Sequence, residues 1–269
     1  MTDVPDLSPP QLLPEGLAPA SARPTGPVTL AIDIGGTGLK AGLLDLAGRL
    51  IGERARVATP RPSTPDAVVP HLQTLGEQLG QFDRVSVGFP GVVQKGVVKT
   101  APNLGTKAWA AYPLSDTLAQ RLGKPVRLLN DATVQGLGVI AGQGLECVIT
   151  LGTGFGFALY QDGRLGPHLE MSQHIVWKDM TYDAYLGVKA LEEVGKKRWR
   201  KRVERALDQL RVVINFDTLY IGGGDARLID FTLPADVRIV SNDAGITGGV
   251  KLWDVALDDA FQGGADTPV

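Results

Sequence analysis

The sequence predicts an α/β protein built as two halves, because one glycine-tipped pattern opens each half. Val28–Asp33 and Leu39–Leu46 enclose a turn of sequence GGTG, and Glu146–Leu151 and Phe157–Gln161 enclose a turn of sequence GTGFG. Short β-prone runs joined by a glycine-rich turn are typical of β-hairpins. We therefore expect two mixed β/α blocks, each opened by a hairpin.

Hydrophobic spacing predicts the other elements of the first half. Leu50–Val57 predicts a third antiparallel strand. Pro65–Leu79 predicts a helix, because its apolar residues recur every three or four positions, and Arg84–Phe89 predicts a buried strand. The remaining elements are a helix over Leu114–Leu122, a strand over Val126–Leu129 and a helix from Asp131 to about Ala141.

The second half continues after its hairpin with a helical stretch from about Thr181 to Val213. A strand over Thr218–Ile221 then ends at the glycine run Gly222–Gly224, and a strand over Val237–Val240 precedes a last helix near Gly245–Leu257.

The two ends of the chain differ from its body. Residues 1–27 hold 7 of the 18 prolines and few aromatic or β-branched residues, so we expect a disordered tail. We expect an N-terminal α/β domain over residues 28–130, a C-terminal α/β domain over 131–260 and a flexible end over 261–269.

The composition limits the class of protein. The 269 residues are 43% hydrophobic and 21% charged, as in folded globular proteins. A formal net charge of −2 gives no reason to expect nucleic acid or a membrane as partner. The one cysteine, Cys147, excludes an intrachain disulfide and a zinc site built from several cysteines. The N-terminus lacks the basic start and apolar stretch of a secretory signal, so we expect a cytoplasmic protein.

The two hairpin turns are candidate phosphate-binding loops. Each carries a threonine between glycines, Thr37 and Thr153, and such turns expose backbone N–H groups that form an anion-binding nest. Neither turn matches the dinucleotide fingerprint or the Walker loop. Each turn alone is equally consistent with a simple hairpin, whereas the pair favours a phosphate chain held between two domains.

Five polar residues are candidates for the chemistry. Asp33 ends the first strand, where it either caps the turn or holds Mg²⁺ through water. Asp131 begins a helix, either as an N-cap or as the base that takes a proton from an attacking hydroxyl. Asn103 offers a loop amide to a polyol. Glu170 and His174 share a loop after the second hairpin, where each is either solvated or a ligand.

Several of these residues fall within five motifs that occur in a fixed order. The motifs are Ala31–Lys40 (AIDIGGTGLK), Val87–Val92 (VGFPGV), Leu129–Ala132 (LNDA), Leu151–Gly154 (LGTG) and Ile221–Asp225 (IGGGD). In this order they resemble the ROK family of sugar kinases and sugar-responsive repressors, over about residues 28–260. Within the family, Gly88–Val93, Thr100–Leu104 and Thr181–Gly187 are most similar to the polyphosphate glucokinases.

The resemblance implies an actin-like (ribonuclease H-like) sugar kinase fold of two domains. It implies a hexose kinase that transfers a phosphoryl group from polyphosphate, ATP or both to the 6-hydroxyl of glucose or a related hexose, with Mg²⁺ as cofactor. It also implies a homodimer. The alternative is a catalytically weak or inactive member of the family that binds sugar as a regulator, against which the retained Asp131 argues.

The resemblance also implies roles for individual residues. Asp131 would be the general base, Asp33 would hold Mg²⁺ through water, and Asn103, Asn130 and Glu170 would bind sugar hydroxyls. The donor phosphates would lie at Gly35, Gly36, Thr37, Gly38, Lys40, Gly152, Thr153 and Gly154, and the adenosine side at Gly222, Gly223 and Gly224.

Two departures from the family bear on the sugar site. Many members bind a structural zinc through one His and three Cys, and a chain with one Cys lacks that set, so no zinc is expected. Three positions after Glu170, where the polyphosphate glucokinases carry a sugar-binding His, this chain has Gln173 followed by His174. Either the loop shifts to present His174, or affinity and sugar choice differ, or activity has decayed.

A run of cations lies on one predicted helix, opposed only by Glu204. The run is either a solvated face or a track for polyphosphate, because clustered cations attract repeating negative charge most strongly. In the first case, the opposite side of the helix turns to the core, with Val194, Trp199, Val203 and Leu207. The cations are Lys196, Lys197, Arg198, Arg200, Lys201, Arg202 and Arg205.

Overall fold

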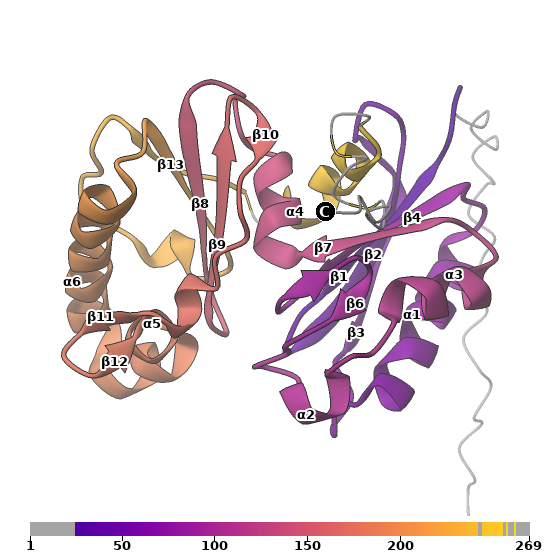
Figure 1. The fold of residues 1–269 in the computed structure, drawn as a ribbon, viewed down its shortest axis with the longest axis horizontal. Coiled ribbons are helices and arrows are strands. Elements are labelled where there is room, and N and C mark those ends of the chain that lie inside the picture. Colours follow the sequence, from indigo (N-terminus) through magenta and orange to yellow (C-terminus); the bar gives the residue numbers. More distant parts are fainter. Residues whose placement is uncertain (1–24, 242–243, 255–256, 258–260, 262–269) are drawn as a thin grey trace, which may run out of the picture.

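Two five-stranded sheets form the framework of the chain (Figure 1). The structure is a computed structural model that describes residues 25–241 and 244–254, together with Leu257 and Phe261. Most of the expected N-terminal tail, and the expected flexible end after Phe261, lie outside the described residues.

The first sheet has the strand order β3-β2-β1-β4-β7. β1 pairs antiparallel with β2, which places Asp33 opposite Lys40, and it pairs parallel with β4. Because β7 is also parallel to β4, the carboxyl ends of β1, β4 and β7 share one edge of the sheet. The strands are β1 (Thr29–Ile34), β2 (Gly38–Leu44), β3 (Leu50–Ala58), β4 (Arg84–Phe89) and β7 (Val126–Asn130).

The second sheet repeats this plan with the order β10-β9-β8-β13-β14. β8 pairs antiparallel with β9 and parallel with β13, and β13 pairs parallel with β14. Two mixed α/β blocks, each opened by a hairpin, are therefore confirmed. The strands are β8 (Leu145–Leu151), β9 (Phe155–Gln161), β10 (Arg164–Leu165), β13 (Thr218–Gly222) and β14 (Val237–Ile239).

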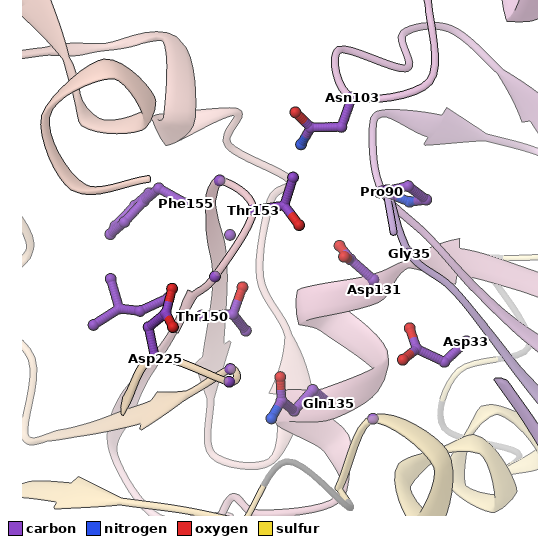
Figure 2. Close-up of a pocket in the computed structure, with 18 of the residues that line it drawn as sticks. Asp33, Gly35, Pro90, Asn103, Asp131, Gln135, Thr150, Thr153, Phe155 and Asp225 are labelled. Carbon is purple, nitrogen blue, oxygen red and sulfur yellow. The ribbon is translucent and has the colours of Figure 1, made fainter. Parts of the chain in front are cut away.

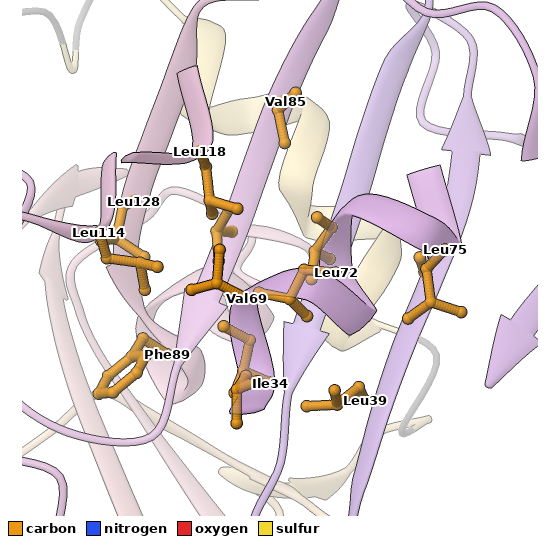
Figure 3. Packing of buried hydrophobic residues seen from close by; sticks show 14 of the residues in the cluster. Ile34, Leu39, Val69, Leu72, Leu75, Val85, Phe89, Leu114, Leu118 and Leu128 are labelled. Carbon is orange, nitrogen blue, oxygen red and sulfur yellow. The ribbon is translucent and has the colours of Figure 1, made fainter. Parts of the chain in front are cut away.

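Helices α1 (Pro65–Leu79) and α3 (Leu114–Leu122) cover one face of the first sheet. Figure 3 shows their apolar residues, among them Leu72 and Leu118, packed against strand residues such as Val85 and Phe89. This burial of one helix face is what the three- and four-residue spacing predicts. Three short elements that the sequence did not predict follow β4: β5 (Val93–Gln94), β6 (Val97–Val98) and α2 (Thr106–Trp109).

Helix α4 (Asp131–Leu137) lies between the two sheets and contacts β4, β7, β8 and β9. It ends before Ala141, where the sequence predicted its end. Glu146 is the physical reason, since its buried carboxylate accepts hydrogen bonds from the N–H groups of Ala141, Gly142 and Gln143. These donors turn the chain away from the helix and into β8.

The segment after β14 returns to the first sheet. In place of one helix over Gly245–Leu257, it forms α7 (Ala244–Thr247) and the 3-10 helix η3 (Gly248–Trp253). Both contact α4 and β1. The Ser86 hydroxyl on β4 donates to the carbonyl of Gly249 (2.6 Å). A Cβ at Gly248 would collide with the carbonyl oxygen of Val134, so this close approach requires glycine.

The stretch predicted as helical from Thr181 to Val213 is two helices, α5 (Tyr182–Leu186) and α6 (Val188–Ile214). Gly187 separates them, and Gly195, with φ of 74°, bends α6 near its start. Trp199, Val203 and Leu207 of α6 pack on the second sheet, on the opposite face from α4. Among the described residues, no helix is both long and apolar enough to cross a membrane.

Three further short elements lie near the second sheet. They are the 3-10 helices η1 (Met171–Gln173) and η2 (Ala226–Leu228) and the hairpin of β11 (Ile175–Trp177) and β12 (Met180–Thr181).

Candidate active site

A cavity of about 790 Å³ opens between the two sheets. The end of β1, the β1–β2 turn, the start of α4, the β8–β9 turn and the residues after β13 all line it. Figure 2 shows the side chains of Asn103, Asp131 and Gln135 in this cavity, with Asn103 and Gln135 on opposite sides of Asp131 in this view. The edge that collects the carboxyl ends of β1, β4 and β7 therefore faces the cavity.

The two glycine turns approach each other across the cavity. A Cβ built on Gly36 would lie 3.3 Å from Cγ2 of Thr153 and 3.4 Å from Cβ of Asn103. A side chain at Gly36 would require Thr153 or Asn103 to shift slightly. The structure thus brings together Gly35–Gly38, Gly152–Gly154 and Asn103, as residues that line one cavity.

Hydrogen bonds hold each turn in shape. Gly35 N–H donates to the carbonyl of Gly38 (2.9 Å), and Arg61 Nη2 donates to the carbonyl of Gly36 (2.7 Å). In the second turn, the Asp183 carboxylate accepts the N–H of Phe155 (2.7 Å). The N–H groups of Gly36, Thr37, Thr153 and Gly154 take no part in these bonds, as in an anion-binding nest.

Asp33 and Lys40 form an ion pair at the cavity wall, with 2.9 Å between Oδ2 and Nζ. They are opposite each other in the β1–β2 register, and both line the cavity. Arg56 faces Lys40 on the next strand, lies over Gly38 and lines the cavity too. Two cations therefore stand beside the first glycine turn, of which the sequence singled out only Lys40.

Asn130 and Asp131 mark the junction of β7 and α4. Asn130, and not Asp131, is the helix N-cap: its Oδ1 accepts the N–H of Thr133 (3.2 Å) and its Nδ2 donates to the carbonyl of Gly91 (3.2 Å). These bonds hold the Asn130 side chain in the protein framework. Because Asn130 is the cap, the Asp131 carboxylate is free to face the cavity. The Asp131 backbone packs against β4, where a Cβ built on Gly88 would lie 3.3 Å from Asp131 Cα.

The surroundings of Asp131 disfavour its charge. Burial, followed by the negative charges of Asp33 and Glu170, raises the pKa of Asp131 to about 7. The N–H of Ala132, which donates to Oδ1 (2.8 Å), offsets part of this effect. A carboxyl group with a pKa near neutral is suited to accept a proton and release it.

The loop after β10 supplies Glu170 to the cavity, together with His168 and Ser172. The Ser172 hydroxyl donates to Glu170 Oε1 (2.5 Å), and His168 Nε2 is 3.8 Å from Oε2. Burial acts to raise the pKa of Glu170, but the neighbouring His168 and Ser172 side chains outweigh it and lower the pKa. Glu170 is thus an ionised hydrogen-bond acceptor.

Gln173 and His174 are exposed and absent from the cavity lining described here. Gln173 Nε2 donates to the Ser172 hydroxyl (3.0 Å), one residue removed from Glu170. The histidine that the loop presents is His168. Its signal was present in the sequence, because residues two apart on an extended segment share a side and His168 precedes Glu170 by two positions.

The far end of the cavity is formed by the residues after β13. Gly223 and Gly224 line it with Asp225, and the apolar Ile239 and Val240 complete the wall. Gly223 has φ of 87°, and a Cβ there would collide with the backbone of Leu151. Gly222 is not among the lining residues and packs instead against the Gln135 side chain.

The basic run on α6 lies outside this cavity lining. Arg200 pairs with Asp230 (2.5 Å), and the Arg202 and Arg205 guanidinium groups stack on Tyr185 and Trp177. The remaining cations, Lys196, Lys197, Arg198 and Lys201, are exposed.

A preformed metal cluster is absent from the part of the chain that the structure describes, where no group of three or more His, Cys, Asp or Glu side chains could hold an ion. Mg²⁺ in phosphoryl-transfer sites is held by one or two carboxylates with water and substrate phosphates. Asp33 at the cavity wall, beside the glycine turns, fits that smaller donor set.

The chain is similar to a known family and to solved structures. The model of the ROK family matches residues 29–168. Polyphosphate glucokinase of Mycobacterium tuberculosis is 35% identical over 233 residues, which are 81% of this chain and 88% of that protein. The crystal structure of the inorganic polyphosphate/ATP-glucomannokinase of Arthrobacter sp. strain KM superposes with a TM-score of 0.77 at 32% identity, covering 84% of this chain and 98% of that one.

A second solved structure shares the fold. The ROK family glucokinase of Streptomyces griseus, in complex with glucose and AMPPNP, has a TM-score of 0.70 at 22% identity, covering 88% of this chain and all of that one (100%).

Proposed function

The chain belongs to the ROK family, and we propose that it is a hexose kinase that transfers a phosphoryl group from polyphosphate, ATP or both to the 6-hydroxyl of glucose. The observation that carries the proposal is the place of Asp131. Its carboxylate, with a pKa of about 7, lies in a cavity lined by two glycine turns and by the polar side chains of Asn103, His168 and Glu170.

The sugar end of the cavity is the side with Asn103 and Glu170. The Glu170 carboxylate accepts hydrogen bonds from sugar hydroxyls, and His168 and the Asn103 amide add further polar contacts. This arrangement orients the 6-hydroxyl toward Asp131. Asn130 supports the site from behind by capping α4, since its side chain is already bonded to the backbone.

Transfer requires the 6-hydroxyl oxygen, the terminal phosphorus and the bridging oxygen of the donor in line, with the base beside the hydroxyl. Asp131 accepts the proton of the 6-hydroxyl as that oxygen bonds to the terminal phosphorus and the bond from this phosphorus to the bridging oxygen of the donor breaks. The N–H groups of the two glycine turns, with Lys40 and Arg56, stabilise the charge on the transferring group. Closure of the two halves over the substrates excludes water from this step.

Mg²⁺ is part of this proposal. Asp33 would hold it through water, together with oxygens of the donor. When bound, the ion neutralises charge on the donor phosphates.

Two observations bear on the donor. The apolar Ile239 and Val240 and the carboxylate of Asp225, at the far end of the cavity, suit a nucleoside with its hydroxyl groups and so support ATP. The exposed cations of α6 support polyphosphate. We propose that the protein uses both donors, as a cytoplasmic homodimer.

A sugar-binding regulator without catalysis is the second candidate. It is less well supported, because such a protein has no need for a carboxylate held between the two turns with a pKa near 7.

Formation of glucose 6-phosphate with Mg²⁺ tests the function, with polyphosphate and ATP supplied separately. We expect donor-dependent turnover that is lost in Asp131→Asn, while glucose binding persists. Glucose binding without turnover for either donor would support the regulator and contradict the kinase.

A further inference from the structure

Gln135 has a buried amide without an acceptor. Its side chain is 5% exposed, and Nε2 has no hydrogen-bond partner among the described residues. Gln135 nevertheless lines the cavity (Figure 2). An unpaired buried N–H group destabilises the folded protein, so such groups are rare unless something else pairs with them.

The position of Gln135 on α4 relates it to the base. It follows Asp131 by four residues, and residues four apart share one face of a helix. Its carboxamide also packs against Gly222, where a Cβ would collide with Nε2. Gln135 therefore lies between the base and the glycine run that begins the far end of the cavity.

The residues on either side indicate what would pair with the amide. The proposed sugar ligands Asn103 and Glu170 line the cavity with Asp131. Gly222 packs against Gln135 and leads directly into Gly223 and Gly224, which line the cavity. A donor whose terminal phosphate lies at Asp131 extends its next phosphates in the direction of the glycine run. Phosphoryl oxygens accept hydrogen bonds only, which is what an unpaired N–H requires.

We propose that Nε2 of Gln135 donates a hydrogen bond to a phosphoryl oxygen of the donor, beyond the group that is transferred. This inference rests on the proposed function. The ligand chemistry is the phosphoanhydride chain that polyphosphate and ATP share.

The test uses Gln135→Met, which keeps the volume and removes the polar group, and Gln135→Glu, which keeps the shape and places a carboxylate there. We expect the apparent KM for ATP and for polyphosphate, measured separately, to rise about tenfold in Gln135→Met. A larger rise is expected in Gln135→Glu, because the carboxylate repels phosphate. The KM for glucose should stay within about twofold. Leu137→Met, on the same helix but outside the cavity lining, is the control and should leave all three KM values unchanged.

Stability separates a ligand role from a packing role. Without ligand, Gln135→Met should unfold at the same temperature as the wild type or at a higher one, because the unpaired amide is gone. Tripolyphosphate or ATP should then raise its unfolding temperature less than that of the wild type. An unchanged donor KM together with an unchanged ligand-induced shift would overturn the proposal, and so would a change confined to the KM for glucose.

Titration calorimetry with ATP and with tripolyphosphate distinguishes this inference from the proposed function. If the wild type binds either ligand but turns over no hexose, the kinase assignment fails while weaker binding by Gln135→Met still supports the role of Gln135. Equal binding by both proteins overturns that role, whether or not the wild type is active. If Gln135→Met does not fold, the same comparison with Gln135→Glu decides in the same way.

Discussion

Gly36 and Thr153 come from different sheets, and a Cβ built on Gly36 would lie 3.3 Å from Cγ2 of Thr153. The two halves of the proposed phosphate site therefore meet at one point of contact. Both glycine turns line the cavity, so the proposed site is made of residues from both halves.

Larger side chains at Gly36 should separate the turns. We expect Gly36→Val to lower kcat/KM by about tenfold or more, because the added Cβ and its two methyl groups overpack a tight contact at a cost of about 1–3 kcal/mol. Gly36→Ala should have a smaller effect. Adding Thr153→Ser, which removes Cγ2, should restore part of the loss in Gly36→Ala, as steady-state kinetics of the single and double variants will show. Purely additive effects would mean that the contact plays no part.

The raised pKa of Asp131 predicts how activity depends on pH. Because the base must be ionised, kcat/KM should fall about tenfold per pH unit below pH 7. Asp33 contributes to the shift through its negative charge. In the metal-free protein, Asp33→Asn should therefore lower the pKa of Asp131, measured by NMR titration of the carboxyl carbon. An unchanged pKa would show that the charge of Asp33 does not contribute to the shift.

The same shift predicts how stability depends on pH. A carboxyl whose pKa is raised on folding, here from 3.8 to about 7, binds more protons in the folded than in the unfolded state between these pH values. Its ionisation therefore destabilises the fold progressively as pH rises from about 4 to 7. Asp131→Asn should leave stability nearly unchanged at pH 4 and raise it at pH 8, by up to about 4 kcal/mol. Equal effects at both pH values, measured by denaturant unfolding, would contradict this.

Sequence patterns predicted well those strands and helices in which hydrophobic residues recur at a regular spacing. The strands of both hairpins and helix α1 follow from local alternation or helical spacing, which depend on burial of one face. Helix ends were less predictable. α4 ends at Leu137 and does not reach Ala141, because Glu146 in the following strand accepts the N–H groups of Ala141, Gly142 and Gln143. No pattern local to the helix contains that information.

The residues of the candidate site also differ in how well the sequence predicted them. The glycine turns and Asp131 were found because their motifs are continuous in sequence. Gln135 and Arg56 were not found, because neither belongs to a continuous motif. Gln135 lies one helical turn after Asp131 on α4, and Arg56 faces Lys40 across the β2–β3 register. In the loop after β10, the resemblance pointed to Gln173 and His174, which are exposed outside the cavity lining in this structure, whereas His168 lines the cavity.

The two loop histidines offer a matched pair of variants. His168 lines the cavity 3.8 Å from the Glu170 carboxylate, whereas His174 is exposed outside the lining. We expect His168→Ala to raise the KM for glucose about tenfold, because it removes a polar contact to the sugar and a partner of Glu170. His174→Ala should change the KM for glucose less than about twofold. The reverse order would show that the loop rearranges to present His174 when sugar binds.

The last prediction concerns the basic run on α6. Trp199, Val203 and Leu207 are buried, which agrees with a helix whose opposite face is solvated, but burial of one face does not explain why that outer face is so rich in cations. Lys197 and Lys201 are exposed four residues apart, whereas Arg205 stacks on Trp177 and contributes to packing.

Replacing Lys197, Lys201 and Arg205 with Gln should raise the apparent KM for polyphosphate and leave that for ATP unchanged, because only a long polyanion reaches from the cavity to this helix. The double variant Lys197→Gln, Lys201→Gln tests the same point without disturbing Trp177. The effect should shrink at high salt, since exposed charges are screened. Equal changes in the KM values for both donors would mean that the basic run is only a solvated face. The donor would then be bound only inside the cavity.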